Sequence, residues 1–159
     1  MVHLAGNPAD MDAILDIAKR RNIYVIEDCA QSWVSYYKGR LAGTIGDFGC
    51  FSTNDYKHIS TGDGGLVITN DEARFRSAFK FADKNYDRLD DGHASRNCEF
   101  LAPNYRMTEL QGAVGLAQID KVERICKRRN EIGDKITAEI SDLEGVYPPK
   151  VLPDCKSSY

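Results

Sequence analysis

The amino-acid sequence predicts an α/β fold, since a helical pattern, a short apolar run and a carboxylate follow one another near its start. Residues 7–21 repeat apolar side chains at helical spacing, and residues 23–26 form a β-branched run typical of a buried strand. That run ends at Glu27 and Asp28. Ligands of α/β proteins bind beyond the carboxyl ends of the strands, so a carboxylate at this point is a candidate binding group.

The first expected helix has a recognisable start and stop. Asn7 can serve as its N-cap, and Pro8 fits the first turn, where no backbone N–H is needed. Asn22 is expected to end the helix. The apolar positions recur three and four residues apart, which predicts one buried stripe: Met11, Ile14, Leu15 and Ala18.

Two more strands and a second helix are expected in the next part of the chain. The strands cover residues 48–51 and 66–69, and a glycine-rich turn at residues 62–65 separates them. Thr69 and Glu72 have the spacing of a capping box, which predicts that a helix begins there.

The C-terminal half is predicted to be largely helical. Residues 84–103 show no periodicity and are interpreted as a loop with a functional or intersubunit role. Thr108 and Gln111 again have capping-box spacing and begin a helix, and a longer helical pattern covers residues 120–141. Residues 142–159 contain several prolines and are typical of a linker, so the chain is expected to be a fragment of a longer enzyme.

The composition narrows the class of protein. The 159 residues carry a formal net charge of −3, which disfavours a nucleic-acid-binding protein. No apolar run approaches the length of a membrane span and the N-terminus does not resemble a secretory signal, so a cytoplasmic location is expected. The five cysteines form no CxxC pair, which argues against a disulfide framework and a structural zinc site. No metal is expected.

Three side chains could take part in chemistry at the ligand edge of the sheet. Lys57 lies between two expected strands, where partial desolvation would lower the pKa of its amine and let it attack a carbonyl. An ordinary surface lysine is the simpler alternative. Asp28 could meet a cationic heterocycle or act as a helix cap. Ser52 could hold a phosphate oxygen or be an ordinary edge serine.

Several short motifs occur in a characteristic order along the chain. They are Asp28-Cys29-Ala30-Gln31, Gly46-Asp47-Phe48-Gly49-Cys50-Phe51-Ser52, Lys57, Gly62-Asp63-Gly64-Gly65 and Asn104-Tyr105-Arg106-Met107. Together they resemble the DegT/DnrJ/EryC1/StrS family of pyridoxal 5'-phosphate (PLP) sugar aminotransferases. The resemblance implies fold type I, that of aspartate aminotransferase, here as a partial α/β/α sandwich with a mostly parallel sheet and long C-terminal helices. Residues 1–120 would be part of the PLP-binding large domain, and residues 121–159 a helix and linker toward a small C-terminal domain.

The resemblance also implies a role for five residues. Lys57 would form a Schiff base with PLP and later act as the proton shuttle. Asp28 would pair with the pyridinium nitrogen, and Gln31 would contact the side of the ring that bears the phenolic oxygen. Ser52 would bind the phosphate. Asn104 would reach the phosphate of the neighbouring subunit's cofactor, which implies a homodimer with shared active sites.

The implied reaction moves an amino group from glutamate or glutamine to a keto-sugar, typically nucleotide-linked, in amino-sugar biosynthesis. Family members that dehydrate sugars carry histidine in place of the reactive lysine, whereas here Lys57 is present and His58 follows it. A PLP-dependent dehydratase and a non-catalytic or truncated fragment are the alternatives. Trp33 stands where the family often has a His-Gly-Ala-like run, and a large ring near the cofactor is therefore expected.

Overall fold

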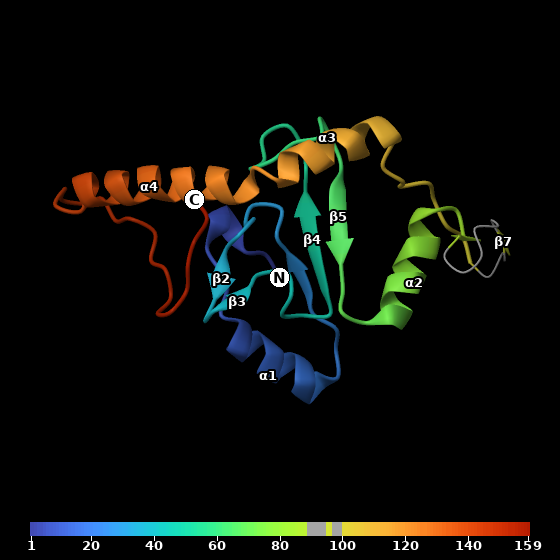
Figure 1. Ribbon diagram of the computed structural model, residues 1–159. Helices are drawn as coiled ribbons and strands as arrows, with labels where there is room; N and C mark the ends of the chain where they lie inside the picture. Colours follow the sequence, from blue (N-terminus) through green and yellow to red (C-terminus); the bar gives the residue numbers. More distant parts are fainter. Residues whose placement is uncertain (89–94, 97–99) are drawn as a thin grey trace.

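The computed structural model describes residues 1–88, 95–96 and 100–159, and it confirms the expected α/β fold (Figure 1). Its helices are the short 3-10 turn η1 (Leu4–Gly6), α1 (Met11–Arg21), α2 (Glu72–Ala82), α3 (Glu109–Ile119) and α4 (Val122–Ile140). Its strands are β1 (Ile26–Asp28), β2 (Tyr36–Tyr37), β3 (Arg40–Leu41), β4 (Phe48–Ser52), β5 (Gly65–Ile68), β6 (Tyr86–Asp87) and β7 (Ser95–Arg96).

The central sheet has the strand order β1-β4-β5 and mixes parallel with antiparallel pairing. β1 runs parallel to β4, with Asp28 opposite Cys50, and Val2 adds a parallel bridge to the outer side of β1. β5 runs antiparallel to β4, so the loop of residues 53–64 joins them without a crossover helix. β2 with β3, and β6 with β7, form two further antiparallel pairs.

The first strand begins later than the sequence suggests. Ile23 and Tyr24 lie outside it and are largely exposed, and β1 covers only Ile26–Asp28. The last turn of α1 explains the delay, because Asn22 adopts a left-handed conformation and the backbone N–H of Ile23 still donates to Ala18. Asn22 therefore ends α1 as expected, but the chain needs several residues to reach the sheet.

The N-caps of α1 and α2 are not the predicted residues. Asp10, not Asn7, caps α1: its carboxylate accepts from the backbone N–H of Ala13 at 3.3 Å and from the Tyr37 hydroxyl at 2.9 Å. The Asn7 side chain instead donates to a backbone carbonyl near the C-terminus. The cap of α1 is thus fixed by a contact with β2, which no local spacing reveals.

Asp71, not Thr69, caps α2, by accepting from the backbone N–H of Arg74 at 2.9 Å. The Thr69 hydroxyl donates to the Asp47 carbonyl at 2.8 Å and so ties the end of β5 to the start of β4. The N-cap therefore lies two residues after Thr69, and α2 begins at Glu72.

The capping box predicted at Thr108 and Gln111 is confirmed. The Thr108 hydroxyl accepts from the Gln111 backbone N–H, and the Gln111 side chain accepts from the Thr108 backbone N–H at 3.0 Å. Thr108→Ala removes the first of these bonds from α3. We expect it to lower the free energy of unfolding by about 1 kcal/mol, whereas Thr108→Ser, which keeps the hydroxyl, stays close to wild type in urea unfolding.

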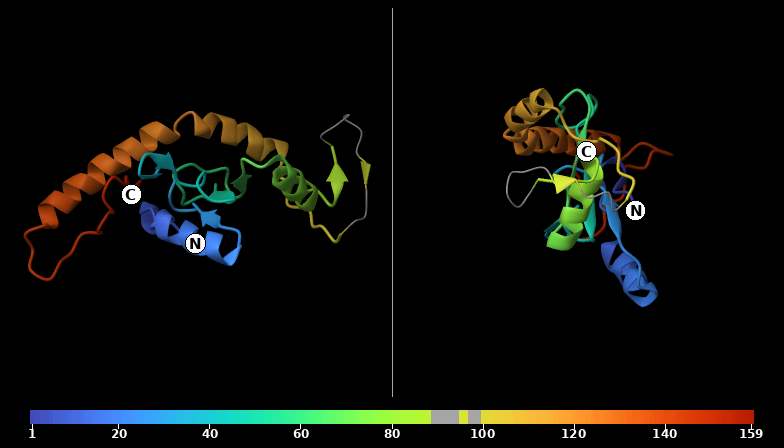
Figure 2. Two further views of the ribbon diagram at one scale, coloured as in Figure 1. Left: turned by 90° about the horizontal axis from the view of Figure 1, so that it is seen from below. Right: turned by 90° about the vertical axis from the view of Figure 1, so that its right-hand side faces the viewer.

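The long C-terminal helix and the end of the chain both pack onto the first half of the molecule. α3 and α4 follow one another along the same side of the sheet (Figure 2). Val122 and Cys126 of α4 join the core cluster around Trp33 and Phe51. The segment that the sequence suggests is a linker ends in residues 155–159, which return to the molecule; Ser157 and Ser158 are buried.

The predicted loop at residues 84–103 is only partly seen. β6 and β7 form a short antiparallel pair within it, which periodicity did not indicate. The rest of it, with Cys98, includes residues outside the described part of the chain. The other four cysteines are free thiols, and none of the helices in the described ranges is long and apolar enough to cross a membrane.

Candidate active site

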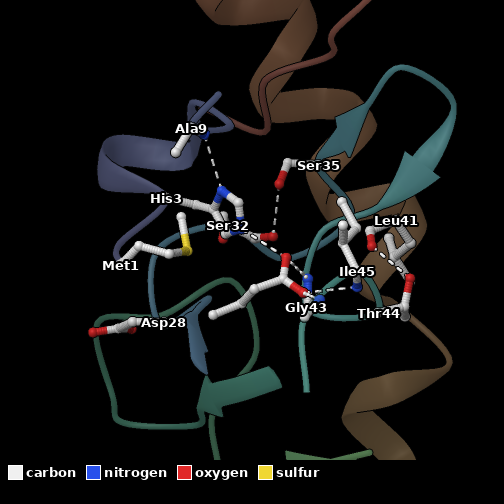
Figure 3. Close-up of polar contacts among 12 residues, drawn as sticks. Met1, His3, Ala9, Asp28, Ser32, Ser35, Leu41, Gly43, Thr44 and Ile45 are labelled. Atoms are coloured by element: carbon white, nitrogen blue, oxygen red, sulfur yellow. Dashed lines mark hydrogen bonds and ion pairs between the residues drawn. The ribbon is translucent and has the colours of Figure 1, made fainter. Parts of the chain in front are cut away.

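The end of β1 places two neighbouring carboxylates on opposite sides of the strand, as the alternation of strand side chains requires. Asp28 points away from the buried group of His3, Gly43 and Ile45 (Figure 3). It is half-buried, and its Oδ1 accepts from the backbone N–H of Ala30 at 3.0 Å. Its second carboxylate oxygen has no hydrogen-bond partner in the described ranges, so this oxygen is free to bind a ligand.

β4 brings Ser52 to the same edge of the sheet as Asp28. The two strands are parallel and Asp28 lies opposite Cys50, two positions before Ser52. The Ser52 hydroxyl accepts from the backbone N–H of Asn54 at 3.3 Å, which leaves its own hydrogen available to donate.

Trp33 supports this edge from within the core. Its indole N–H donates to the Ser52 carbonyl at 3.0 Å, and its ring packs on Phe51 with centroids 4.8 Å apart. Only 6% of its surface is exposed. The ring expected near the cofactor therefore holds the end of β4 from below and is not itself an open stacking surface.

Lys57 lies on the loop that leaves the end of β4, residues 53–64. Hydrogen bonds close the neck of this loop: the Thr53 and Thr61 hydroxyls lie 2.8 Å apart, and the Thr53 backbone N–H donates to Gly64 at 2.9 Å. Ile59 anchors the loop in the core. Lys57 itself is half-buried, and its ammonium has no hydrogen bond or ion pair with the described residues.

Helix α3 holds the far side of the same loop. The Gln111 side chain, which completes the capping box, also donates to the Asp63 carbonyl at 3.0 Å. The loop that bears Lys57 is therefore held by its own neck, by the core and by α3. Such fixation favours a defined position for the amine.

The other two predicted residues lie apart from this group. Gln31 follows β1 but is exposed, and its side-chain oxygen accepts from the Ala5 backbone N–H at 2.9 Å. Asn104 is exposed in the segment between α2 and α3, where its side-chain oxygen accepts from the Arg106 backbone N–H. This segment is fixed to the end of α2, since Arg106 lies 3.0 Å from the buried Asp83 carboxylate. The structure shows no hydrogen bond from Asn104 to Asp28, Ser52 or Lys57.

Beneath Asp28 lies a buried carboxylate that the sequence analysis did not single out. Glu27 is fully buried, and both its oxygens accept hydrogen bonds. Oε2 accepts from His3 Nε2 at 3.0 Å and from the Gly43 backbone N–H at 2.8 Å. Oε1 accepts from the backbone N–H groups of Ile45 at 2.7 Å and Gly46 at 2.6 Å. Glu27 thereby joins β1 to the N-terminus and to the glycine-rich segment before β4.

The protonation states of this group follow from its contacts. His3 Nδ1 accepts from the Ala9 backbone N–H at 3.1 Å, so the ring proton resides on Nε2 and is donated to Glu27. Burial raises the pKa of Glu27, but the hydrogen bonds from His3, Gly46, Gly43 and Ile45 outweigh it and the net pKa is lowered.

The same group does not form a metal site, although possible ligand atoms of His3, Glu27 and Cys29 lie within 4.8 Å of one another. Both nitrogens of His3 and both oxygens of Glu27 already have hydrogen-bond partners. Burial raises the pKa of the Cys29 thiol to about 12, so the thiolate that a metal needs is disfavoured. The group is a structural support beneath the ligand edge.

Comparison with known proteins identifies one family and relatives within it. The model of the DegT/DnrJ/EryC1/StrS aminotransferase family matches residues 1–159. The chain is 39% identical over 146 residues to a GDP-perosamine synthase of Escherichia coli O157:H7, covering 92% of this chain and 39% of that protein. It is 35% identical to a putative L-glutamine:3-amino-2,3-dideoxy-scyllo-inosose aminotransferase of Micromonospora echinospora, covering 93% of this chain and 35% of that protein. The chain thus spans less than half the length of these relatives.

Solved structures share the fold over nearly the whole chain. The aminotransferase of Psychrobacter cryohalolentis superposes with a TM-score of 0.88 at 33% identity, covering 99% of this chain and 44% of that one. The GDP-4-keto-6-deoxy-D-mannose-3-dehydratase of E. coli, solved with bound hydrated PLP, superposes with a TM-score of 0.86 at 26% identity and covers 99% and 43%. Aminotransferases and a dehydratase thus share this arrangement of elements.

Proposed function

Because the chain belongs to the DegT/DnrJ/EryC1/StrS aminotransferase family, we propose that the whole protein is a PLP-dependent sugar aminotransferase. One observation carries the proposal beyond family membership. The half-buried Lys57 has an ammonium group without a partner in the described residues, on a fixed loop that leaves the sheet edge of Asp28 and Ser52. The carboxylate of Asp28 and the hydroxyl of Ser52 thus belong to one sheet edge, and the amine of Lys57 belongs to the loop that leaves it.

The donor set fits PLP group by group. An aldehyde requires an amine, which Lys57 offers. A ring nitrogen that must stay protonated requires a carboxylate, and Asp28 has one oxygen free of other partners. A phosphate requires hydrogen-bond donors. The Ser52 hydroxyl accepts from Asn54, and its own hydrogen remains available to donate to a phosphate oxygen. When bound, PLP supplies the electron sink that weakens the bonds to the α-carbon of an amino acid.

The residues of this chain perform the remaining steps. Lys57 would hold the cofactor through its amine, and its Nζ would accept and return the proton of the amino-acid donor's α-carbon. Asp28 would keep the ring nitrogen protonated, because a nearby carboxylate raises the pKa of such a nitrogen. Ser52 orients the cofactor through its phosphate, and Trp33 fixes the backbone of Ser52.

Asp28→Asn tests the role of the carboxylate. The asparagine oxygen can still accept from the Ala30 N–H, so the turn after β1 is preserved while the negative charge is lost. We expect turnover and PLP affinity of the whole protein to fall by about tenfold or more, the worth of one charge-assisted hydrogen bond. Fluorescence titration with PLP and initial-rate assays measure the two effects. Wild-type affinity and turnover in this variant would contradict the role.

We propose, more specifically, a nucleotide-linked keto-sugar as acceptor and glutamate or glutamine as donor, with a cytoplasmic homodimer as the working form. The names of the perosamine synthase and the L-glutamine aminotransferase among the relatives support these choices. Asn104, to which the resemblance assigns the shared site, is exposed on a segment that Arg106 fixes to Asp83. It would reach the cofactor phosphate of the neighbouring subunit.

The proposal includes a division into domains. Residues 1–120 would belong to the PLP-binding domain, and residues 121–159 would lead to a small C-terminal domain.

The dehydratase fold neighbour makes sugar dehydration the second candidate function. The presence of Lys57 favours transamination, because the lysine both holds the cofactor and shuttles the proton. Product analysis of the whole protein separates the two reactions: an amino sugar supports the proposal, and a deoxy sugar formed without amino transfer contradicts it.

A further inference from the structure

The residue after Lys57 is a buried histidine with a single hydrogen bond. His58 is 7% exposed, and its Nε2 lies 2.9 Å from the backbone carbonyl of Ser158, a residue 100 positions away in the sequence. A carbonyl only accepts, so the ring proton resides on Nε2 and is donated to Ser158. Nδ1 is buried without a partner in the described residues.

The carbonyl that receives this bond is itself fixed. We call residues 155–159 the tail segment. Within it, the Ser158 N–H donates to Gly6 at 3.2 Å, and Asn130 of α4 donates to the Ser157 carbonyl at 3.0 Å. Lys156 exchanges two backbone hydrogen bonds with Tyr36 of β2, at 2.8 and 2.9 Å. The tail segment is thus tied to η1, to α4 and to β2, and it presents a rigid acceptor to His58.

The surroundings keep His58 neutral. Burial lowers the pKa of His58 most, the hydrogen bond to Ser158 opposes this, and the positive charges of Arg129 on α4 and Lys57 on its own loop lower the pKa further. From the tail segment the Ser158 carbonyl binds the ring. A neutral ring with its proton on Nε2 makes the bond to Ser158 and adds no positive charge beside the Lys57 amine.

We propose that His58 is a positioning residue that ties the backbone of Lys57 to the tail segment, through the hydrogen bond from its Nε2 to the Ser158 carbonyl. The inference rests on the proposed function, in which Lys57 is the reacting amine. Because residues 57 and 58 share a peptide bond, a fixed imidazole limits how far the Lys57 backbone can move. The tie adds to the neck of the loop, formed by Thr53 and Thr61.

The test uses the full 159-residue chain and two substitutions of His58. His58→Leu fills the site without a donor, whereas His58→Gln places an amide N–H near the position of Nε2. Hydrogen exchange then reads both sides of the tie without PLP, at the Lys57 N–H, which donates to Asn54, and at the Ser158 N–H, which donates to Gly6. We expect His58→Leu to accelerate both by about two- to tenfold, the range for one lost hydrogen bond, and His58→Gln to restore both.

A second readout concerns the amine. Reaction with PLP followed by borohydride reduction gives the ratio of adduct on Lys57 to adduct on the exposed Lys121. We expect this ratio to fall in His58→Leu and to recover in His58→Gln. Ala18→Gly, which weakens the distant helix α1, serves as the stability control and is expected to leave the ratio unchanged.

Two results would overturn the inference: wild-type exchange at Lys57 in a folded His58→Leu chain, or a folded His58→Gln chain that behaves like His58→Leu. Equal labelling of Lys57 and Lys121 in the wild-type chain would contradict the proposed function instead. The exchange rates would still decide whether His58 holds the loop.

Discussion

Replacing Lys57 by alanine is expected to abolish covalent retention of PLP and to slow transamination by the whole protein at least about 10²- to 10⁴-fold, the contribution of one positioned acid–base group. The side chain is half-buried and its ammonium has no partner in the described residues, so its removal breaks no hydrogen bond or ion pair there. Initial rates measured at saturating PLP, with PLP retention after gel filtration, give the two readouts.

Lys57→Arg is the matched variant for this prediction. The guanidinium keeps the positive charge and most of the length, but its pKa lies above 12, so no neutral amine is available to attack a carbonyl. We expect the same loss as in the alanine variant. Full turnover in either variant would show that another group performs the chemistry.

Replacing Glu27 by glutamine is expected to lower the free energy of unfolding by about 2–6 kcal/mol, because two buried donors lose their acceptor at about 1–3 kcal/mol each. The substitution turns one acceptor oxygen into an NH₂ donor. That donor would face a group that already donates, either the His3 ring or the backbone N–H groups of residues 43–46. Since whole domains are stable by only about 5–15 kcal/mol, the effect is a large share of the total.

Glu72→Gln provides the control, because Glu72 is an exposed partner of Arg76 on α2 and is expected to change stability by less than about 1 kcal/mol. Chemical denaturation of the three chains measures the difference. A Glu27→Gln chain as stable as wild type would show that the network does not hold the fold.

The hydrogen-bond network of Glu27 should also make the stability of the chain depend on pH in the acid range. The folded-state pKa of Glu27 is lowered below its ordinary value of 4.5, so the stability it contributes is fully present above pH 4.5 and is lost as the pH falls through the folded-state pKa. The wild-type chain should therefore lose more stability on acidification below pH 4.5 than Glu27→Gln. Parallel loss in both chains would assign the acid sensitivity to other carboxylates.

Local patterns predicted the parts of the fold that local forces determine. The β4 strand and the capping box at Thr108 lie where the sequence places them, because each depends on residues a few positions apart. The cap of α1 depends on Tyr37, and the late start of β1 depends on the left-handed turn at Asn22. Neither effect has a signature in the spacing of apolar residues.

The candidate site also contains residues that local motifs predict and residues whose partners lie far away in the sequence. Asp28, Ser52 and Lys57 are predicted because they stand in ordered motifs, and the parallel register brings the first two to one edge. Glu27 looked like a second strand-end acid, whereas the two-residue period of the strand turns it inward. Its partners come from His3 and the segment before β4, and no pattern along the chain connects them. The tie between His58 and Ser158 likewise appears only once the tail segment has folded back.

The most direct test of the site is the position of the PLP adduct on the wild-type 159-residue chain. The chain is mixed with PLP and reduced with borohydride, and the modified peptides are mapped by mass spectrometry. A phosphopyridoxyl group on Lys57 alone is the predicted result. Adducts scattered over exposed lysines, or no adduct at all, would contradict a formed PLP site in this chain and favour a non-catalytic role for it.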